Sequence, residues 1–312
     1  MENLLLCFNA ITPLLLLILL GYFLKRIQFL SQNDIEAFDK FCFKIAIPVM
    51  LFYNVYNADF THGFDFSLIL FMASGYLVVF LLSYFIVPRI VHDVDDAITI
   101  IHGICHGNLA VIGLPLIINL FGENNITVYS ILVACTSPII NPLMVFEHEK
   151  LAGKEIKLPV LLKNMISSPF LVGTLTGLVA HFLPVQIPSF IMTSVKAMRD
   201  MATPLCLVAL GGTFAFSDFK KYSKEVISSL LLRCVIIPGI IFAVAVAVGY
   251  RGIVLASLMV IFASPSATAT YSYCASYSGN SKLAAQIVMY SSLFSILTIF
   301  LWMFSFLQLG LI

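Results

Sequence analysis

The residues best suited to chemistry lie in one short stretch, from His102 to Pro115, which reads HGICHGNLAVIGLP. His102 and His106 are four residues apart, so a helix would place both imidazoles on one face, a spacing that can bind a metal or carry a proton. No third nitrogen ligand or acidic residue lies nearby in the sequence, so we expect no metal site. Proton handling, substrate contact and helix packing all stay open for this pair.

Helix breakers interrupt the same stretch at Gly103, Gly107, Gly113 and Pro115, with the amide of Asn108 among them. A second stretch, residues 263–274 (ASPSATATYSYC), is also polar and contains a proline. Backbone freed inside a membrane must be buried in protein or line a cavity, and discontinuous helices mark the substrate sites of many transporters. Half-helix N-termini would offer N–H groups and a positive dipole to a carboxylate. The residues that we expect around such a ligand are Asn108, Pro115, Ser264, Pro265, Ser266 and Thr268.

Composition indicates a protein that crosses a membrane several times. Hydrophobic residues make up 60% of the chain and charged residues 11%, whereas soluble domains are roughly 45–50% apolar and 25% charged. Mean hydropathy is +1.02. The net charge of +1 gives no electrostatic footprint for nucleic acid. The seven cysteines lie in or beside apolar segments without paired spacing, so we expect packing residues rather than disulfides, and no cofactor.

Windows of about 20 apolar residues predict ten membrane spans. In order, they cover residues 4–24, 38–56, 66–87, 98–120, 126–146, 161–183, 190–213, 226–248, 252–274 and 283–307. Eleven Lys and Arg residues lie in the odd-numbered connections, against only Arg251 in the even-numbered ones. Because cytoplasmic loops carry the excess, we expect both termini outside the cytoplasmic membrane.

An internal repeat relates the two halves of the chain. A shift of 156 residues, half of 312, superimposes prolines, glycines and lysines, and it places Asn108 on Ser264. The matching pairs are Pro13 and Pro169, Gly21 and Gly177, Lys40 and Lys196, and Pro48 and Pro204. Five spans per half put the halves in opposite orientations, so we predict an all-α fold of two inverted five-helix repeats, whose broken fourth and ninth helices cross at the membrane midplane. The expected repeats are residues 1–146 and 161–312, joined by a cytoplasmic linker at 147–160.

Several motifs, in this order, resemble the auxin efflux carrier family in its short prokaryotic form. They are GYFLKR at 21–26, IAIPVMLF at 45–52, Asn108 with IGLP at 112–115, PLCLVALGG at 204–212 and SPSATATYSYCASYSGN at 264–280. The resemblance implies an inverted-repeat carrier of the bile acid and auxin type, with an elevator-like motion and a homodimeric assembly. It also implies that Asn108 meets a substrate carboxylate, and that Pro115 and Pro265 mark the breaks. Malonate, malate or auxin-like acids are the implied substrates.

Arg233 lies about seven residues into the eighth expected span, where a basic residue is costly. It could contact the substrate, or it could extend along the helix towards the interface. We therefore expect a secondary transporter of small organic anions, embedded in the lipid bilayer, rather than an enzyme. Two alternatives stay open: a receptor with the carrier fold that binds a carboxylate without flux, and a membrane-embedded enzyme that uses His102 and His106.

Overall fold

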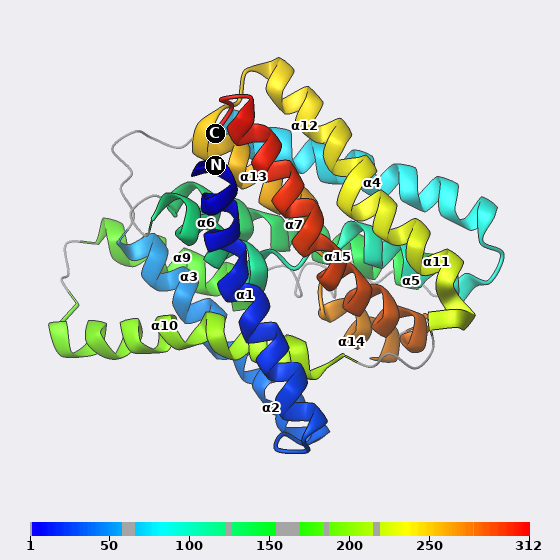
Figure 1. Ribbon diagram of the computed structural model, residues 1–312, viewed down its shortest axis with the longest axis horizontal. Coiled ribbons are helices and arrows are strands. Elements are labelled where there is room, and N and C mark those ends of the chain that lie inside the picture. Colours follow the sequence, from blue (N-terminus) through cyan, green and yellow to red (C-terminus); the bar gives the residue numbers. More distant parts are fainter. Residues whose placement is uncertain are drawn as a thin grey trace.

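The computed structural model describes residues 2–57, 66–122, 126–153, 169–183, 187–214, 219–276 and 278–312. Within these ranges every regular element is a helix, and the only β pairing is an isolated bridge between Gly107 and Ser266. Figure 1 shows the helices packed as long, crossing rods around shorter interrupted ones. The prediction of an all-α protein is confirmed.

Five helical units of the described chain are long and apolar enough to cross a membrane. They are α1 (Glu2–Arg26), α4 (Phe66–Ile90), α7 (Thr127–Leu151), the run 221–248 within α11 (Phe219–Leu231), η4 (Leu232–Ile236) and α12 (Ile237–Val248), and α15 (Ser281–Gln308). Their outer faces expose large apolar side chains such as Leu19, Leu82 and Leu301. Contiguous apolar surface of this kind suits hydrocarbon rather than water. The chain is therefore a multi-pass membrane protein.

Further helices lie within or beside the remaining expected spans. They are α2 (Gln32–Phe41), η1 (Cys42–Ala46), α3 (Ile47–Tyr56), α5 (Val94–Cys105), η2 (Leu109–Gly113), α6 (Leu114–Phe121), α9 (Pro169–Phe182), α10 (Ser189–Gly212), α13 (Gly252–Ala263) and α14 (Ala269–Ser276). Helix α10 is long enough to span but carries three charged side chains. Asp200 accepts from Lys196 at 2.8 Å and from Arg199 at 2.7 Å, so these charges compensate one another.

Helix α7 extends beyond the boundary expected from the sequence. It continues to Leu151, so residues 147–151, expected to open the cytoplasmic linker, are helical. The physical reason is burial: Glu147 is 0% exposed and His148 is 3% exposed, because both lie against other helices. The remainder of the expected linker from 154, and the expected start of the second repeat at 161–168, lie outside the described residues.

Close helix crossings depend on glycine at α1 and α9. A Cβ atom on Gly21 of α1 would lie 2.0 Å from the carbonyl oxygen of Val208 in α10. A Cβ atom on Gly177 of α9 would lie 2.7 Å from the carbonyl oxygen of Phe52 in α3. Backbone therefore touches backbone at both crossings, as small residues permit between membrane helices.

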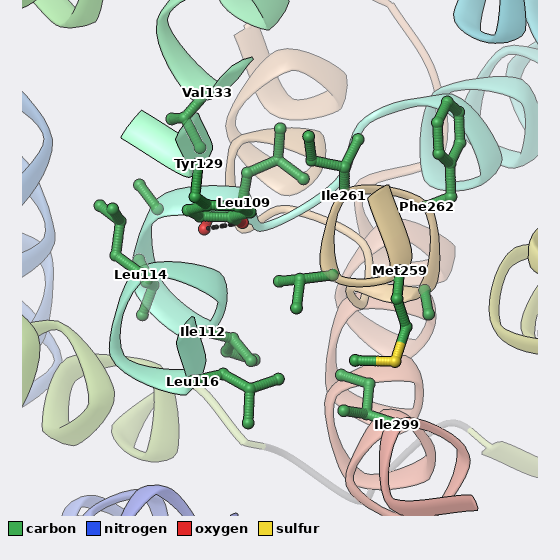
Figure 2. Close-up of a cluster of buried hydrophobic side chains, with 14 of the residues drawn as sticks. Leu109, Ile112, Leu114, Leu116, Tyr129, Val133, Met259, Ile261, Phe262 and Ile299 are labelled. Atoms are coloured by element: carbon green, nitrogen blue, oxygen red, sulfur yellow. Dashed lines mark hydrogen bonds between the residues drawn. The ribbon is translucent and has the colours of Figure 1, made fainter. Parts of the chain in front are cut away.

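A buried apolar cluster holds the interrupted helices in place (Figure 2). Side chains from η2 and α6 meet side chains from α7, α13 and α15 there, including Ile112, Leu116, Met259 and Ile299. The hydroxyl of Tyr129 in α7 donates to the carbonyl oxygen of Leu109 at 2.8 Å. That bond satisfies a carbonyl in the first turn after the interruption, which the irregular backbone would otherwise leave unpaired.

Candidate binding site at the two helix breaks

Both stretches expected to interrupt a helix do so. Helix α5 ends at Cys105 and the helical path resumes at Leu109, while α13 ends at Ala263 and α14 begins at Ala269. The two extended segments run antiparallel beside each other. The Asn108 N–H donates to the Pro265 carbonyl at 2.8 Å, and the Ala267 N–H donates to the His106 carbonyl at 2.8 Å. Each break thereby satisfies backbone groups freed by the other, which a low-dielectric interior requires.

The predicted serines of the second break bond within the protein. The Ser266 hydroxyl donates to the Gly103 carbonyl at 2.6 Å, and the Ser266 N–H donates to the Ser291 hydroxyl at 3.1 Å. The Ser264 hydroxyl accepts from Arg233 at 3.0 Å. Pro115 lies in the first turn of α6 rather than in the paired segments, at a position where proline is well tolerated. These contacts show how the breaks are stabilised, whereas a contact of these side chains with a ligand stays a prediction.

Among the predicted site residues, Asn108 and Thr268 have buried polar atoms that make no hydrogen bond within the described part of the chain. Asn108 is 2% exposed, and its Nδ2 atom has no hydrogen-bond acceptor in the described part of the chain. The Thr268 hydroxyl is buried without a partner there as well, as is that of Thr270 nearby. A buried polar group without a partner costs about 1–3 kcal/mol. Three such groups at the breaks can therefore bind a polar ligand.

Arg233 lies at the centre of the site. Its side chain is 1% exposed and donates to the last turns of both half-helices: Nη1 to the Ile104 carbonyl at 3.0 Å, and Nε to the Ser264 carbonyl at 2.8 Å. Its Nη2 atom donates to the Ile261 carbonyl at 3.3 Å. Helix C-termini carry partial negative charge, so a guanidinium is stabilised where two of them meet. Arg233 therefore points into the protein rather than towards an interface.

The charge of Arg233 has no carboxylate partner among the described residues. The salt bridges found there belong to α10, and the groups that receive the guanidinium are neutral carbonyl and hydroxyl oxygens. Carbonyl dipoles lower the cost of burying the charge but leave its sign uncompensated. Within the described residues, Arg233 is thus a buried positive charge held by neutral oxygens.

Gly107 makes room for the guanidinium. A Cβ atom on it would lie 1.9 Å from Nη2 of Arg233 and 2.7 Å from the Ser264 hydroxyl oxygen. Gly107→Ala should therefore cost at least one of the arginine's hydrogen bonds, or about 1.5–3 kcal/mol. Thermal unfolding in detergent measures this loss. Gly239→Ala is the control, because its Cβ would meet only ring carbons of Trp302, at 3.3 and 3.7 Å; equal losses in the two variants would contradict the prediction.

A row of histidines lies beside the first break. His102 Nε2 is 2.9 Å from His106 Nδ1, as their spacing predicted, and His102 Nδ1 is 3.3 Å from His148 Nε2 of α7. The ring of Tyr273 packs against all three. In the described ranges no three His, Cys, Asp or Glu side chains are arranged to hold a metal ion.

Sequence reasoning did not include His148 or Glu147 in the site, because both were placed in the expected linker. The only signal available was the position of EHE directly after an apolar run, at 147–149.

An apolar pocket opens beside the first break, between α1, η2, α6 and α15. Its volume is about 20 Å³, which is room for about one water molecule. The lining residues include Ile11, Leu14, Ile112, Leu116, Ser295 and Ile299. Ile112 is one helical turn beyond Asn108, so the pocket adjoins the polar site along the chain.

Comparison with known proteins supplies the remaining evidence. Residues 6–303 match the family described as membrane transport protein. An uncharacterized transporter of Methanocaldococcus jannaschii is 22% identical over 302 residues, which is 94% of this chain and 97% of that protein. An uncharacterized transporter of Methanothermobacter thermautotrophicus is 22% identical over 298 residues, or 94% of this chain and 96% of that protein.

Proposed function

The chain belongs to the membrane transport protein family, to which the auxin efflux carriers that its motifs resemble also belong, and we propose that it is a secondary transporter of small organic anions. The substrates are carboxylates such as malonate or malate, or auxin-like acids. They bind at the two helix breaks and cross the cytoplasmic membrane by an elevator-type motion. The protein acts as a carrier rather than as an enzyme, and it works as a homodimer.

The observation that carries this proposal is that a buried arginine, Arg233, and a buried amide, Asn108, both lie at the helix breaks. A buried guanidinium without a carboxylate partner supplies positive potential, and a buried amide Nδ2 without an acceptor supplies a directed donor. An anion with oxygen acceptors complements both groups. The arginine is occupied by carbonyls, so it attracts the anion over a distance rather than gripping it. Weak, long-range attraction favours release after each passage.

The inverted repeat is part of the proposal, and element boundaries support it. Shifting by 156 residues carries α2 through α3, at 32–56, onto 188–212, against 189–212 for α10. The same shift carries α5, at 94–105, onto 250–261, close to α13 at 252–263. It carries α7, at 127–151, onto 283–307, close to α15 at 281–308.

A pair of contacts supports the same correspondence. Gly21 contacts Val208, and the shift of 156 residues relates Gly21 to Gly177 and Val208 to Phe52. Gly177 does lie against Phe52. Related contacts at related positions are what a duplicated five-helix unit would produce. With the excess of basic residues in odd-numbered loops, the repeats then have opposite orientations and both termini are outside.

Counterflow in proteoliposomes tests the proposed function. Labelled malonate, malate and indole-3-acetate are offered to vesicles preloaded with the same unlabelled acid, for the wild type and for Asn108→Ala. The wild type should exchange at least one acid. The variant should lose roughly ten- to a hundredfold in apparent affinity, because one hydrogen bond to a charged group contributes about 1.5–3 kcal/mol.

Asn54→Ala is the matched control for this experiment. Asn54 is also buried, at 5% exposure, and its Nδ2 atom likewise lacks an acceptor among the described residues, but it lies in α3 outside the breaks. Its replacement should leave exchange unchanged. Full exchange by Asn108→Ala would remove the amide from the site. Binding of an acid without exchange by the wild type would favour the receptor alternative.

A further inference from the structure

The histidine row continues beyond the residues needed for anion binding. His106 belongs to the first break, where its carbonyl accepts from Ala267. His102 lies one turn back along α5 and is 0% exposed, and His148 lies near the end of α7 and is 3% exposed. Two nitrogen-to-nitrogen contacts join the three imidazoles from the break to the end of α7. They are 2.9 Å between His106 and His102 and 3.3 Å between His102 and His148. Neither the amide nor the guanidinium of the binding site requires this line.

Glu147 adds a buried acidic group at the same end of α7. It is 0% exposed, and neither of its carboxylate oxygens has a hydrogen-bond donor in the described part of the chain. A charge buried in an apolar medium without a partner is costly, and intramembrane carboxyl and imidazole groups are typical of proton pathways. The group is therefore suited to exchange a proton as its surroundings change.

We infer that His106, His102 and His148 form a proton relay between the substrate site and the end of α7 that carries Glu147, and that it couples anion movement to a proton. The inference rests on the proposed transport function. Protonation of the relay adds a positive charge next to an entering anion, so the pair crosses as a less charged unit. Return of the empty carrier then requires release of the proton.

The transfer step balances within the three rings. A proton taken up at Nε2 of His106 makes that ring cationic, and its Nδ1 proton passes to Nε2 of His102. His102 in turn passes its Nδ1 proton to Nε2 of His148, and the Nδ1 proton of His148 passes to a water molecule at the end of α7. One proton enters and one leaves, and each neutral ring ends as the opposite tautomer. Rotation of the rings restores the starting tautomers and keeps the net transfer, whereas reverse hops would carry the proton back.

Several titratable or charged groups surround the relay and set its response to pH. Tyr273 of α14 packs on the three rings, and Arg233 of η4 lies within electrostatic range of His106. Glu147 of α7 is close enough to interact electrostatically with the thiols of Cys105 on α5 and Cys274 on α14. Burial and the nearby guanidinium both disfavour a positive charge at His106, and a bound anion offsets that cost. Substrate and proton therefore bind together.

The test separates coupled transport from exchange, using His148→Gln. Counterflow moves substrate in both directions without net proton transfer, so the variant should retain it within about twofold of wild type. Uptake driven by an imposed pH gradient requires the relay, so the rate of this uptake should fall at least tenfold in the variant. Gradients of both signs are imposed, because reconstituted carriers insert in either orientation. His92→Gln is the matched control, since His92 is exposed and lies before α5; it should match wild type in both assays.

Each result bears on the inference. Retained counterflow with lost gradient-driven uptake supports the relay. Wild-type counterflow that ignores the pH gradient, a His148→Gln variant that still responds to the gradient, or a variant that loses both activities overturns it. Absence of counterflow in the wild type would instead overturn the proposed function and the coupling with it, so the two failures are distinguishable.

Discussion

Replacement of Arg233 by glutamine should weaken both the fold and the affinity for anions. The guanidinium bonds the last turns of α5 and α13 through three carbonyls and one hydroxyl, and the shorter amide can reach only part of this set. Bonds to a charged group contribute about 1.5–3 kcal/mol each, so we expect a loss of about 3 kcal/mol or more in unfolding free energy. Loss of the buried charge should also weaken anion binding by at least about tenfold, which corresponds to 1.4 kcal/mol.

Arg233→Lys distinguishes the two roles of the residue. Lysine keeps the charge but has no planar fork, so it cannot bond both half-helices at once. It should lose stability as glutamine does, while retaining more anion affinity than glutamine. Thermal unfolding in detergent, with and without the acid that wild type exchanges, measures both quantities. If glutamine and lysine weaken binding equally, the charge of Arg233 does not attract the substrate; if neither lowers stability, the carbonyl contacts are not important to the fold.

The breaks could be predicted from sequence because their signals are local. Gly, Pro and polar residues interrupt otherwise apolar runs, and the structure interrupts helices at 106–108 and 264–268. The partner of each break could not be inferred this way, because paired backbone groups such as those of Asn108 and Pro265 lie in different halves. The internal repeat predicted that the two broken helices cross, and the β-bridge between Gly107 and Ser266 shows which backbone positions pair.

Arg233 and His148 show what sequence patterns miss. The carbonyl partners of Arg233 are as far as 129 residues away, and a carbonyl has no residue type to mark it. A buried arginine paired with carbonyls therefore has the same sequence signature as one that extends to an interface. His148 stands in a charged segment, EHEK, that indicates solvent when it is considered alone. Only the packing of α7 against α5 and α14 places its ring against His102 and Tyr273.

Gly21→Ala should destabilise the protein even though alanine favours helices. The gain in helix propensity is about 0.5–1 kcal/mol. Against it, the new Cβ would lie 2.0 Å from the Val208 carbonyl oxygen and 2.9 Å from its Cα, so the obstacle is backbone and cannot rotate away. Overpacking typically costs about 1–3 kcal/mol in stability. We expect a cost of about 3 kcal/mol here, because the backbone that the new Cβ meets cannot move aside. We expect a net loss of about 2 kcal/mol in thermal unfolding measured in detergent.

The related position makes this prediction a test of the repeat as well. Gly177→Ala should destabilise in the same direction but less, because its Cβ would lie 2.7 Å rather than 2.0 Å from a backbone oxygen, that of Phe52. Leu20→Val is the control for α1, since Leu20 is 45% exposed on the outer face, and it should have little effect. A tolerated Gly21→Ala would mean that α1 and α10 can separate at little cost. Such freedom would argue against rigid packing of these two helices, and the proposed elevator-type motion needs rigid helices against which the broken helices move.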